Sequence, residues 1–130
     1  MIALDTNVLA RLLLRDDERQ YAKALALLQS DGVFTAPVTV VVELVWVLES
    51  NECTVDDIVK ALTLLLGLPN FQPQQAPALQ VALQDYAKGM DFADALHLAL
   101  SQQDDSFRTF DKAFAKLAQK ADSQPPVSLV

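Results

Sequence analysis

The sequence predicts a three-layer α/β/α fold with a short, mainly parallel sheet of four to five strands, formed as a single domain over residues 1–130. Short apolar runs alternate with longer segments whose apolar residues recur at helical spacing, a pattern typical of parallel strands connected by helices. Apolar residues make up 52% of the 130 residues, which is enough for a full core and argues against disorder. A chain of this length suits one domain.

The N-terminal part of the chain is expected to hold two strands and four helices. The expected strands are Ile2–Leu4, as a buried strand, and Val33–Ala36. The expected helices are Asn7–Arg15, Asp16–Ser30, Val38–Ser50 and Thr54–Gly67. The β-branched residues of Val38–Ser50 favour a strand, but the length of the segment and Pro37 at its start favour a helix. Thr54 and Asp57 form a variant of the capping box that starts many helices.

The C-terminal part continues the alternation of strands and helices. A short strand is expected at Asn70–Gln72, a strand at Ser106–Phe110 and a closing edge strand at Val127–Val130. The expected helices are Pro77–Lys88, which ends at Gly89, Asp91–Gln103 and Asp111–Ala121. Glycine after a helix and acids at a helix start are typical end signals.

The composition indicates a soluble cytoplasmic protein with no membrane span. The start of the chain lacks the basic and apolar segments of a signal peptide, and the long apolar stretch Val33–Leu48 contains Glu43. The single cysteine, Cys53, excludes an internal disulfide and fits a reducing compartment. The net charge of −7 argues against a basic nucleic-acid-binding face, unless several of the acids hold divalent cations.

Acidic residues fall where ligands bind in such folds, outside the carboxyl ends of the strands. Asp5 and Asp111 directly follow expected strands, and Glu43 lies about two turns into a helix that starts at the same edge. Asp91 and Asp94 are three residues apart at the start of a helix, so they share a face. The sequence therefore predicts that four or five acids meet in one crevice.

A cluster of carboxylates needs a cation. Two carboxylates about 5 Å apart repel by about 3 kcal/mol at an effective dielectric constant near 20. Oxygen ligands select hard ions such as Mg²⁺ or Mn²⁺, and no Cys/His cluster competes for this assignment. Such an ion lowers the pKa of bound water and stabilises a phosphodiester under attack.

Four segments resemble the acidic motifs of PIN-domain ribonucleases, and most of all those of VapC-type toxins from toxin–antitoxin pairs. The segments are LDTNVL, VVELVWVL, DFADALHLA and TFDKAF. The resemblance implies that the catalytic and metal-binding tetrad is Asp5, Glu43, Asp94 and Asp111, with Asp91 as an auxiliary metal ligand. It also implies that Thr6, Asn7 and Thr109 are polar residues that steady the site.

The resemblance further implies an activity and partners. The expected reaction is hydrolysis of RNA phosphodiesters with Mg²⁺ or Mn²⁺, which leaves a 5′-phosphate and a 3′-hydroxyl. The expected assembly is a homodimer that a cognate antitoxin inhibits, in a type II toxin–antitoxin system. From the charges alone, the candidate RNA contacts are Arg11, Arg15, Lys88 and Lys112, with Lys112 first because it directly follows a proposed metal ligand. His97, the only histidine, is interpreted as a packed, hydrogen-bonded residue rather than a catalytic base.

Alternative interpretations stay open at this stage. Asp5, Asp91 and Asp111 are placed to act as helix N-caps, whereas Glu43 and Asp94 have no such role. The chain is alternatively a non-enzymatic acidic module that binds a basic partner. A further alternative is another Mg²⁺-dependent phosphotransfer enzyme, such as a haloacid-dehalogenase-type phosphatase. That class has a second aspartate two residues after the first, where this chain has Asn7.

Overall fold

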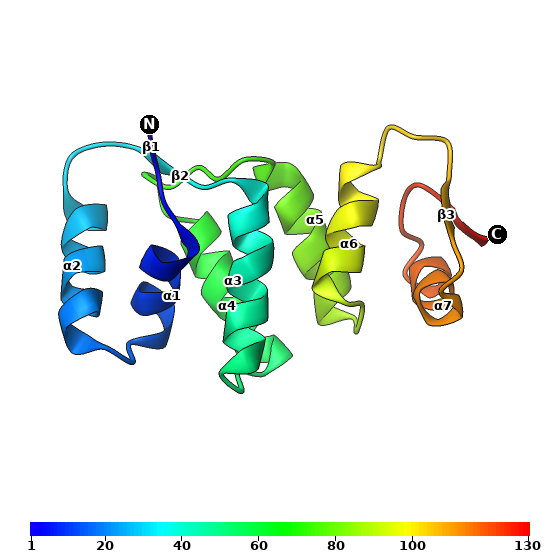
Figure 1. Ribbon diagram of the computed structural model, residues 1–130. Coiled ribbons are helices and arrows are strands. Elements are labelled where there is room, and N and C mark those ends of the chain that lie inside the picture. The colour runs from blue at the N-terminus through cyan, green and yellow to red at the C-terminus, as the bar shows by residue number, and fades with distance from the viewer. The chain divides into compact units, whose positions relative to one another are not determined.

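The computed structural model describes all residues, Met1–Val130, and contains seven helices and four short strands. The chain divides into two compact units, Met1–Ala76 and Pro77–Val130. Each unit holds one two-stranded parallel sheet (Figure 1). None of the seven helices is both long and apolar enough to cross a membrane.

The first unit contains the predicted two strands and four helices. Its elements are β1 (Ile2–Ala3), α1 (Thr6–Leu14), α2 (Glu18–Gln29), β2 (Phe34–Thr35), α3 (Val38–Ser50) and α4 (Val55–Leu66). In the parallel pair β1–β2, Ile2 lies opposite Phe34 and Ala3 opposite Thr35. Where a short strand was expected near residue 71, a single bridge joins Phe71 to Phe34.

Helix α1 packs against both α2 and α3 in the first unit, and α3 packs against α4 (Figure 1). The prediction that β1 is buried is wrong, because Ile2 is 49% exposed and Ala3 is exposed as well. The strand is only two residues long and lies beside the chain terminus, so burial begins at Leu4. The backbone N–H of Leu4 donates a hydrogen bond to the carbonyl of Thr35 at 2.8 Å.

The ambiguous segment Val38–Ser50 is a helix over its whole predicted length. Its buried residues are Val41, Leu44, Val45 and Leu48. This spacing of three and four residues lets one helical face enter the core, and that burial outweighs the strand preference of the β-branched residues. The next helix begins with the predicted capping box: Thr54 Oγ1 accepts from the Asp57 backbone N–H at 3.1 Å, and the Asp57 carboxylate accepts from the Thr54 N–H at 3.3 Å.

The second unit contains three helices and two strands. Its elements are α5 (Ala76–Ala87), α6 (Phe92–Leu100), β3 (Phe107–Thr109), α7 (Lys112–Lys120) and β4 (Val127–Leu129). Strands β3 and β4 are parallel, with Phe107 opposite Val127 and Thr109 opposite Leu129. Helix α6 ends three residues earlier than predicted. The Ser101 hydroxyl there donates to the His97 carbonyl at 2.8 Å, a local bond that competes with helix continuation.

Candidate active site

Two of the predicted acids lie at equivalent junctions, each between a strand and the helix that follows it. Asp5 joins β1 to α1, and its Oδ1 accepts a hydrogen bond from the Thr6 backbone N–H at 2.8 Å. Asp111 joins β3 to α7, and its Oδ1 accepts from the Phe114 backbone N–H at 3.0 Å. Both are helix N-caps and both are exposed, so each carboxylate keeps a second oxygen free for a ligand.

The start of helix α6 carries two further acids. Asp91 is the N-cap, and its Oδ2 accepts from the Asp94 backbone N–H at 3.1 Å. Asp94 lies in the first turn and its side chain is half-buried. Asp94 does not cap the helix, and its carboxylate accepts no hydrogen bond within the helix.

Asp94 lies close enough to two other acids of the second unit to interact with their charges. Burial raises the pKa of Asp94, and the negative charges of Asp91 and then Asp111 raise that pKa further. His97, one turn along the same helix, lowers the pKa by a smaller amount. The interpretation of His97 as a packed residue is wrong, because its side chain is exposed. A partly buried carboxylate whose pKa is raised by like charges is characteristic of functional sites.

Glu43 occupies the middle of α3 in the first unit. Its side chain is exposed, between the buried residues Val41 and Leu44, and it makes no hydrogen bond or ion pair. A carboxylate at this position neither caps the helix nor neutralises a neighbouring cation. It is therefore available to an external ligand, as is the second oxygen of Asp5.

The three polar residues that were predicted to steady the site differ in their contacts. Thr109 Oγ1 accepts a hydrogen bond from the Asp111 backbone N–H at 3.0 Å and so fixes the backbone of that acid. The Thr6 hydroxyl is buried and has no hydrogen-bond partner. Asn7, the residue after Thr6 on α1, is exposed. A buried hydroxyl without a partner costs free energy, which is characteristic of a position where a ligand or water completes the hydrogen bonds.

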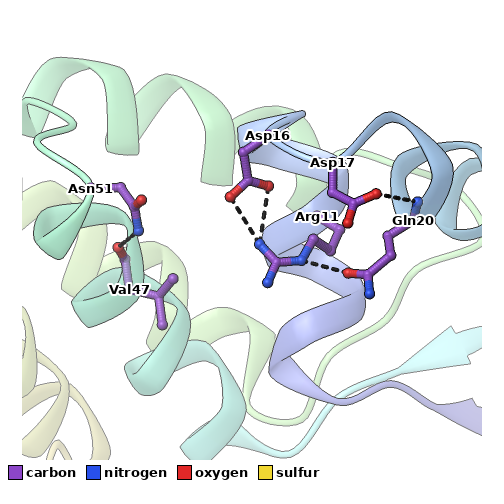
Figure 2. A network of polar contacts seen from close by, with 6 residues as sticks. All are labelled: Arg11, Asp16, Asp17, Gln20, Val47 and Asn51. Atoms are coloured by element: carbon purple, nitrogen blue, oxygen red, sulfur yellow. Dashed lines mark hydrogen bonds and ion pairs between the residues drawn. The ribbon is translucent and has the colours of Figure 1, made fainter.

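The predicted RNA contacts of the first unit are engaged within the protein. The Arg11 guanidinium contacts both carboxylate oxygens of Asp16, at 2.9 and 3.0 Å, and donates from Nε to Gln20 at 2.7 Å (Figure 2). Arg15 pairs with Glu18 at 3.8 Å and lies over the Tyr21 ring, 4.2 Å from its centroid. The positive charges of α1 are thus largely met by neighbouring acids.

Lys112 is exposed, as Arg15 is, but unlike these arginines it forms no ion pair. Two more exposed lysines follow it on α7, at Lys116 and Lys120. Of these three lysines only Lys112 was predicted as an RNA contact, although the four-residue spacing that places all three on one helix face is visible in the sequence. Phe110, directly before Asp111, was also missed, since burial rather than exposure is expected of phenylalanine.

The residues present fit a hard divalent cation. The five acids offer oxygen ligands only, the donor set that Mg²⁺ and Mn²⁺ prefer. Burial first, and then the negative charges of Asp91 and Asp111, raise the pKa of Asp94, and a cation would compensate those charges. Within neither unit do three or more His, Cys, Asp or Glu side chains form a group arranged around one ion.

Comparison with curated proteins gives no match. The family model described as PIN domain matches residues 2–120, most of the chain, and the match runs through both units. The fold of this family is three-layer α/β/α, so the predicted fold class is confirmed, although the four strands pair as two two-stranded sheets and not as the predicted single sheet of four to five strands. Members of this family are in general nucleases that use divalent metal ions. The chain therefore belongs to the PIN domain family.

Proposed function

We propose that the protein is a metal-dependent endoribonuclease that hydrolyses RNA phosphodiesters in the cytoplasm, as the toxin of a type II toxin–antitoxin system. The observation that carries the proposal is the group Asp91, Asp94 and Asp111, whose mutual repulsion contributes to the raised pKa of Asp94. A nuclease family and a local excess of carboxylates together favour metal-assisted phosphodiester hydrolysis. The resemblance of the four acidic motifs to VapC-type toxins supports the assignment as a toxin.

In this proposal Asp5, Glu43, Asp94 and Asp111 are the catalytic acids and bind the metal, with Asp91 as an auxiliary ligand. Bound Mg²⁺ or Mn²⁺ supplies Lewis acidity, which favours deprotonation of water and stabilises charge on the phosphoryl oxygens. Glu43, whose side chain makes no hydrogen bond or ion pair, would supply a further oxygen ligand or orient the attacking water.

The fixed position of Asp111 matters for the same reaction. Its backbone is held by Thr109 and its Oδ1 by the Phe114 N–H, so the remaining oxygen is presented with little freedom. Water attacks phosphorus in line, the bond to the 3′-oxygen breaks, and that oxygen takes up a proton. The products carry a 5′-phosphate and a 3′-hydroxyl. Preorganised ligands of this kind avoid the cost of ordering during the reaction.

We also propose that residues 1–130 act as one nuclease domain although they fold as two compact units. The family match supports this, because it begins in the first unit and ends in the second. The proposed catalytic acids are likewise divided between the units, with Asp5 and Glu43 in one and Asp94 and Asp111 in the other.

The test is cleavage of a labelled single-stranded RNA by the purified chain with Mg²⁺ or Mn²⁺, and then with excess EDTA. We expect cleavage to stop in the chelator and to return when metal is added in excess, because the ligands are carboxylates only. Full activity in EDTA would rule the mechanism out. Inactivity with Mn²⁺, together with metal-independent binding of an arginine-rich peptide, would favour the acidic-module alternative, which the exposed acids and the net charge of −7 support.

We propose a homodimer, with the cognate antitoxin as a further partner. Two large apolar side chains support this, because Trp46 on α3 is 66% exposed and Leu64 on α4 is 74% exposed, and apolar surface of this kind is characteristic of interfaces. Sedimentation at micromolar concentration is expected to show a dimer for the wild type and a monomer for Trp46→Glu. The control Gln103→Glu adds the same charge to an exposed loop position and should remain dimeric. A wild type that sediments only as a monomer would contradict the proposal.

A further inference from the structure

Helix α7 carries a row of lysines along one exposed face. Lys112, Lys116 and Lys120 are all exposed and stand four residues apart, so neighbouring members have Cβ atoms about 5–6 Å apart and the row spans about 12 Å. No acidic residue occurs within α7. A face with three cations and no anion repels itself unless something negative lies against it.

These lysines are unpaired, which sets them apart from the arginines of α1. The ion pairs of the protein join Arg11 to Asp16 and Arg15 to Glu18. In a chain with 17 acids and 10 lysines and arginines, partners for cations are abundant. Because no acidic side chain pairs with them, the lysines of α7 keep their positive charges available to an anionic ligand from outside the chain.

The far end of the row opens into a hollow. Lys120 and Lys88, the residue after the end of α5, line this hollow together with Leu117 and Ala121. Its volume is about 370 Å³, within the range of pockets that hold small organic groups. Two cations beside two apolar side chains suit a nucleotide, which has an anionic phosphate and a flat, largely apolar base.

The near end of the row carries an exposed aromatic ring. Phe110 lies between Thr109 and Asp111, and its side chain is 81% exposed. The cost of leaving a phenylalanine in water is large. An exposed ring beside a proposed catalytic acid offers a platform on which an unpaired base can stack.

We propose that Phe110 and the lysines of α7 form the binding surface for single-stranded RNA. One base stacks on Phe110, the phosphates follow Lys112, Lys116 and Lys120 away from Asp111, and the strand enters the hollow beside Lys88. The proposal rests on the ribonuclease function proposed above, and names the part of the protein that holds the substrate. A single strand is required because the bases of a duplex are stacked on each other and are not free to stack on a side chain.

The test is binding of a dye-labelled single-stranded RNA of about twelve nucleotides to the full-length chain in EDTA, over a series of salt concentrations. Each phosphate contact with a single strand contributes about −0.7 to the slope of log K against log salt. The double variant Lys116→Gln/Lys120→Gln should therefore flatten the slope by about 1.4. The control Lys60→Gln removes an exposed lysine from α4 and should leave the slope unchanged.

Substitution of Phe110 should change the RNA affinity but not its salt dependence. Phe110→Ala should weaken binding by about tenfold, within the range for one stacked base, without changing the salt slope. Phe110→Trp should preserve binding, because the larger ring also stacks. Leu100→Ala, at an exposed position at the end of α6, is the matched control and should bind as the wild type does. Melting curves for all variants verify that each is folded.

Three results would overturn the proposal. They are wild-type RNA binding that is undetectable, lysine variants that keep the wild-type slope and affinity, and a blunt RNA duplex that binds as tightly as the single strand. A parallel cleavage assay with Mn²⁺ separates this outcome from failure of the ribonuclease proposal. If the wild type cleaves RNA but the variants bind RNA as the wild type does, only the proposed binding surface is wrong. If the variants lose binding as predicted but the wild type does not cleave RNA, only the proposed nuclease activity is wrong.

Discussion

The junctions β1–Asp5–α1 and β3–Asp111–α7 use one local design in different surroundings. In each, an aspartate follows a short parallel strand and caps the next helix. Asp5 bonds the N–H of the very next residue, whereas Asp111 bonds an N–H three residues on and has its own N–H held by Thr109. The backbone around Asp111 is therefore the more constrained of the two.

The charges around the two junctions differ more than the backbones do. The cations of α1 are neutralised by Asp16 and Glu18. The lysines of α7 are unpaired, and Asp111 itself raises the pKa of Asp94. A capping aspartate is therefore a local feature, whereas its chemical role depends on the residues that the fold brings near it.

Substitutions of Asp5 and Asp111 should change the cleavage rate most, and they distinguish a capping role from a catalytic role at both junctions. Asp5→Asn and Asp111→Asn should each lower the cleavage rate by at least about a hundredfold, since even a residue that only supports a metal ligand contributes tenfold to a hundredfold. Asparagine caps helices as well as aspartate does, so melting temperatures in EDTA should change little. Alanine at either position should lose activity and also about 1 kcal/mol of stability.

Asp17 provides the matched control for this experiment. It caps α2 by accepting from the Gln20 N–H at 3.0 Å (Figure 2) and lies outside the proposed tetrad. Asp17→Asn should keep full activity in an assay with Mn²⁺. If Asp5→Asn or Asp111→Asn also keeps full activity, that aspartate is a cap and nothing more.

A smaller effect is expected on stability at Asp94. Asp94→Asn removes one of the repelling charges, so in EDTA it should raise the free energy of unfolding by about 1 kcal/mol after solvent screening, or the melting temperature by about 4 °C. Added Mg²⁺ or Mn²⁺ should stabilise the wild type more than the variant, because binding to the native state adds stability.

The pH dependence of the same variant has a definite sign. The pKa of Asp94 is raised above its ordinary value of 3.8, so the native state binds the proton more tightly than the unfolded chain does. The loss of folding stability caused by the charged Asp94 is complete above its native pKa and disappears as the pH falls towards 3.8. The advantage of Asp94→Asn should therefore be largest at neutral pH and fade in acid. Asp105→Asn, in an exposed loop, is the control, and a variant at Asp94 that melts below the wild type would make Asp94 a structural partner.

The smallest expected effect compares the cations of the two helices. Lys112→Gln should flatten the salt slope of RNA binding by about 0.7. Arg11→Gln should flatten it less, because RNA must first displace Asp16, and should cost at most about 1 kcal/mol of stability. Equal slopes for the two variants would show that the ion pairs of α1 open on binding and would remove the contrast between the helices.

Much of the fold was predictable because it depends on local signals. The capping box at Thr54 and the buried spacing within Val38–Ser50 fixed two helices to within a residue of their observed starts. Two features were not predicted: the exposure of the Ile2 side chain, and the residue at which α6 ends. These depend on a strand that is too short to be covered and on a hydroxyl that bonds the preceding turn.

The candidate site was predictable to a similar extent. The rule that acids follow strands located Asp5 and Asp111, and the same sequence signal correctly indicated that both are caps. The pairing of Arg11 with Asp16 was missed, because the identity of a side chain's partner depends on how two helices and their connecting turn pack. The exposure of Phe110 was missed because hydrophobicity predicts burial on average, and this side chain is an exception to that average.

Strand β4 gives the end of the chain a direct influence on Asp111. It is the one strand paired with β3, and the Val130 N–H donates to the carbonyl of Thr109 at 3.0 Å. The residue that holds Asp111 is thus itself held by Val130, beyond residue 120, where the family match ends. In engineering terms, removing Val127–Val130 would leave backbone groups of β3 unpaired. Such a truncation, or a fusion that pulls on this strand, would lower activity without altering a single acid.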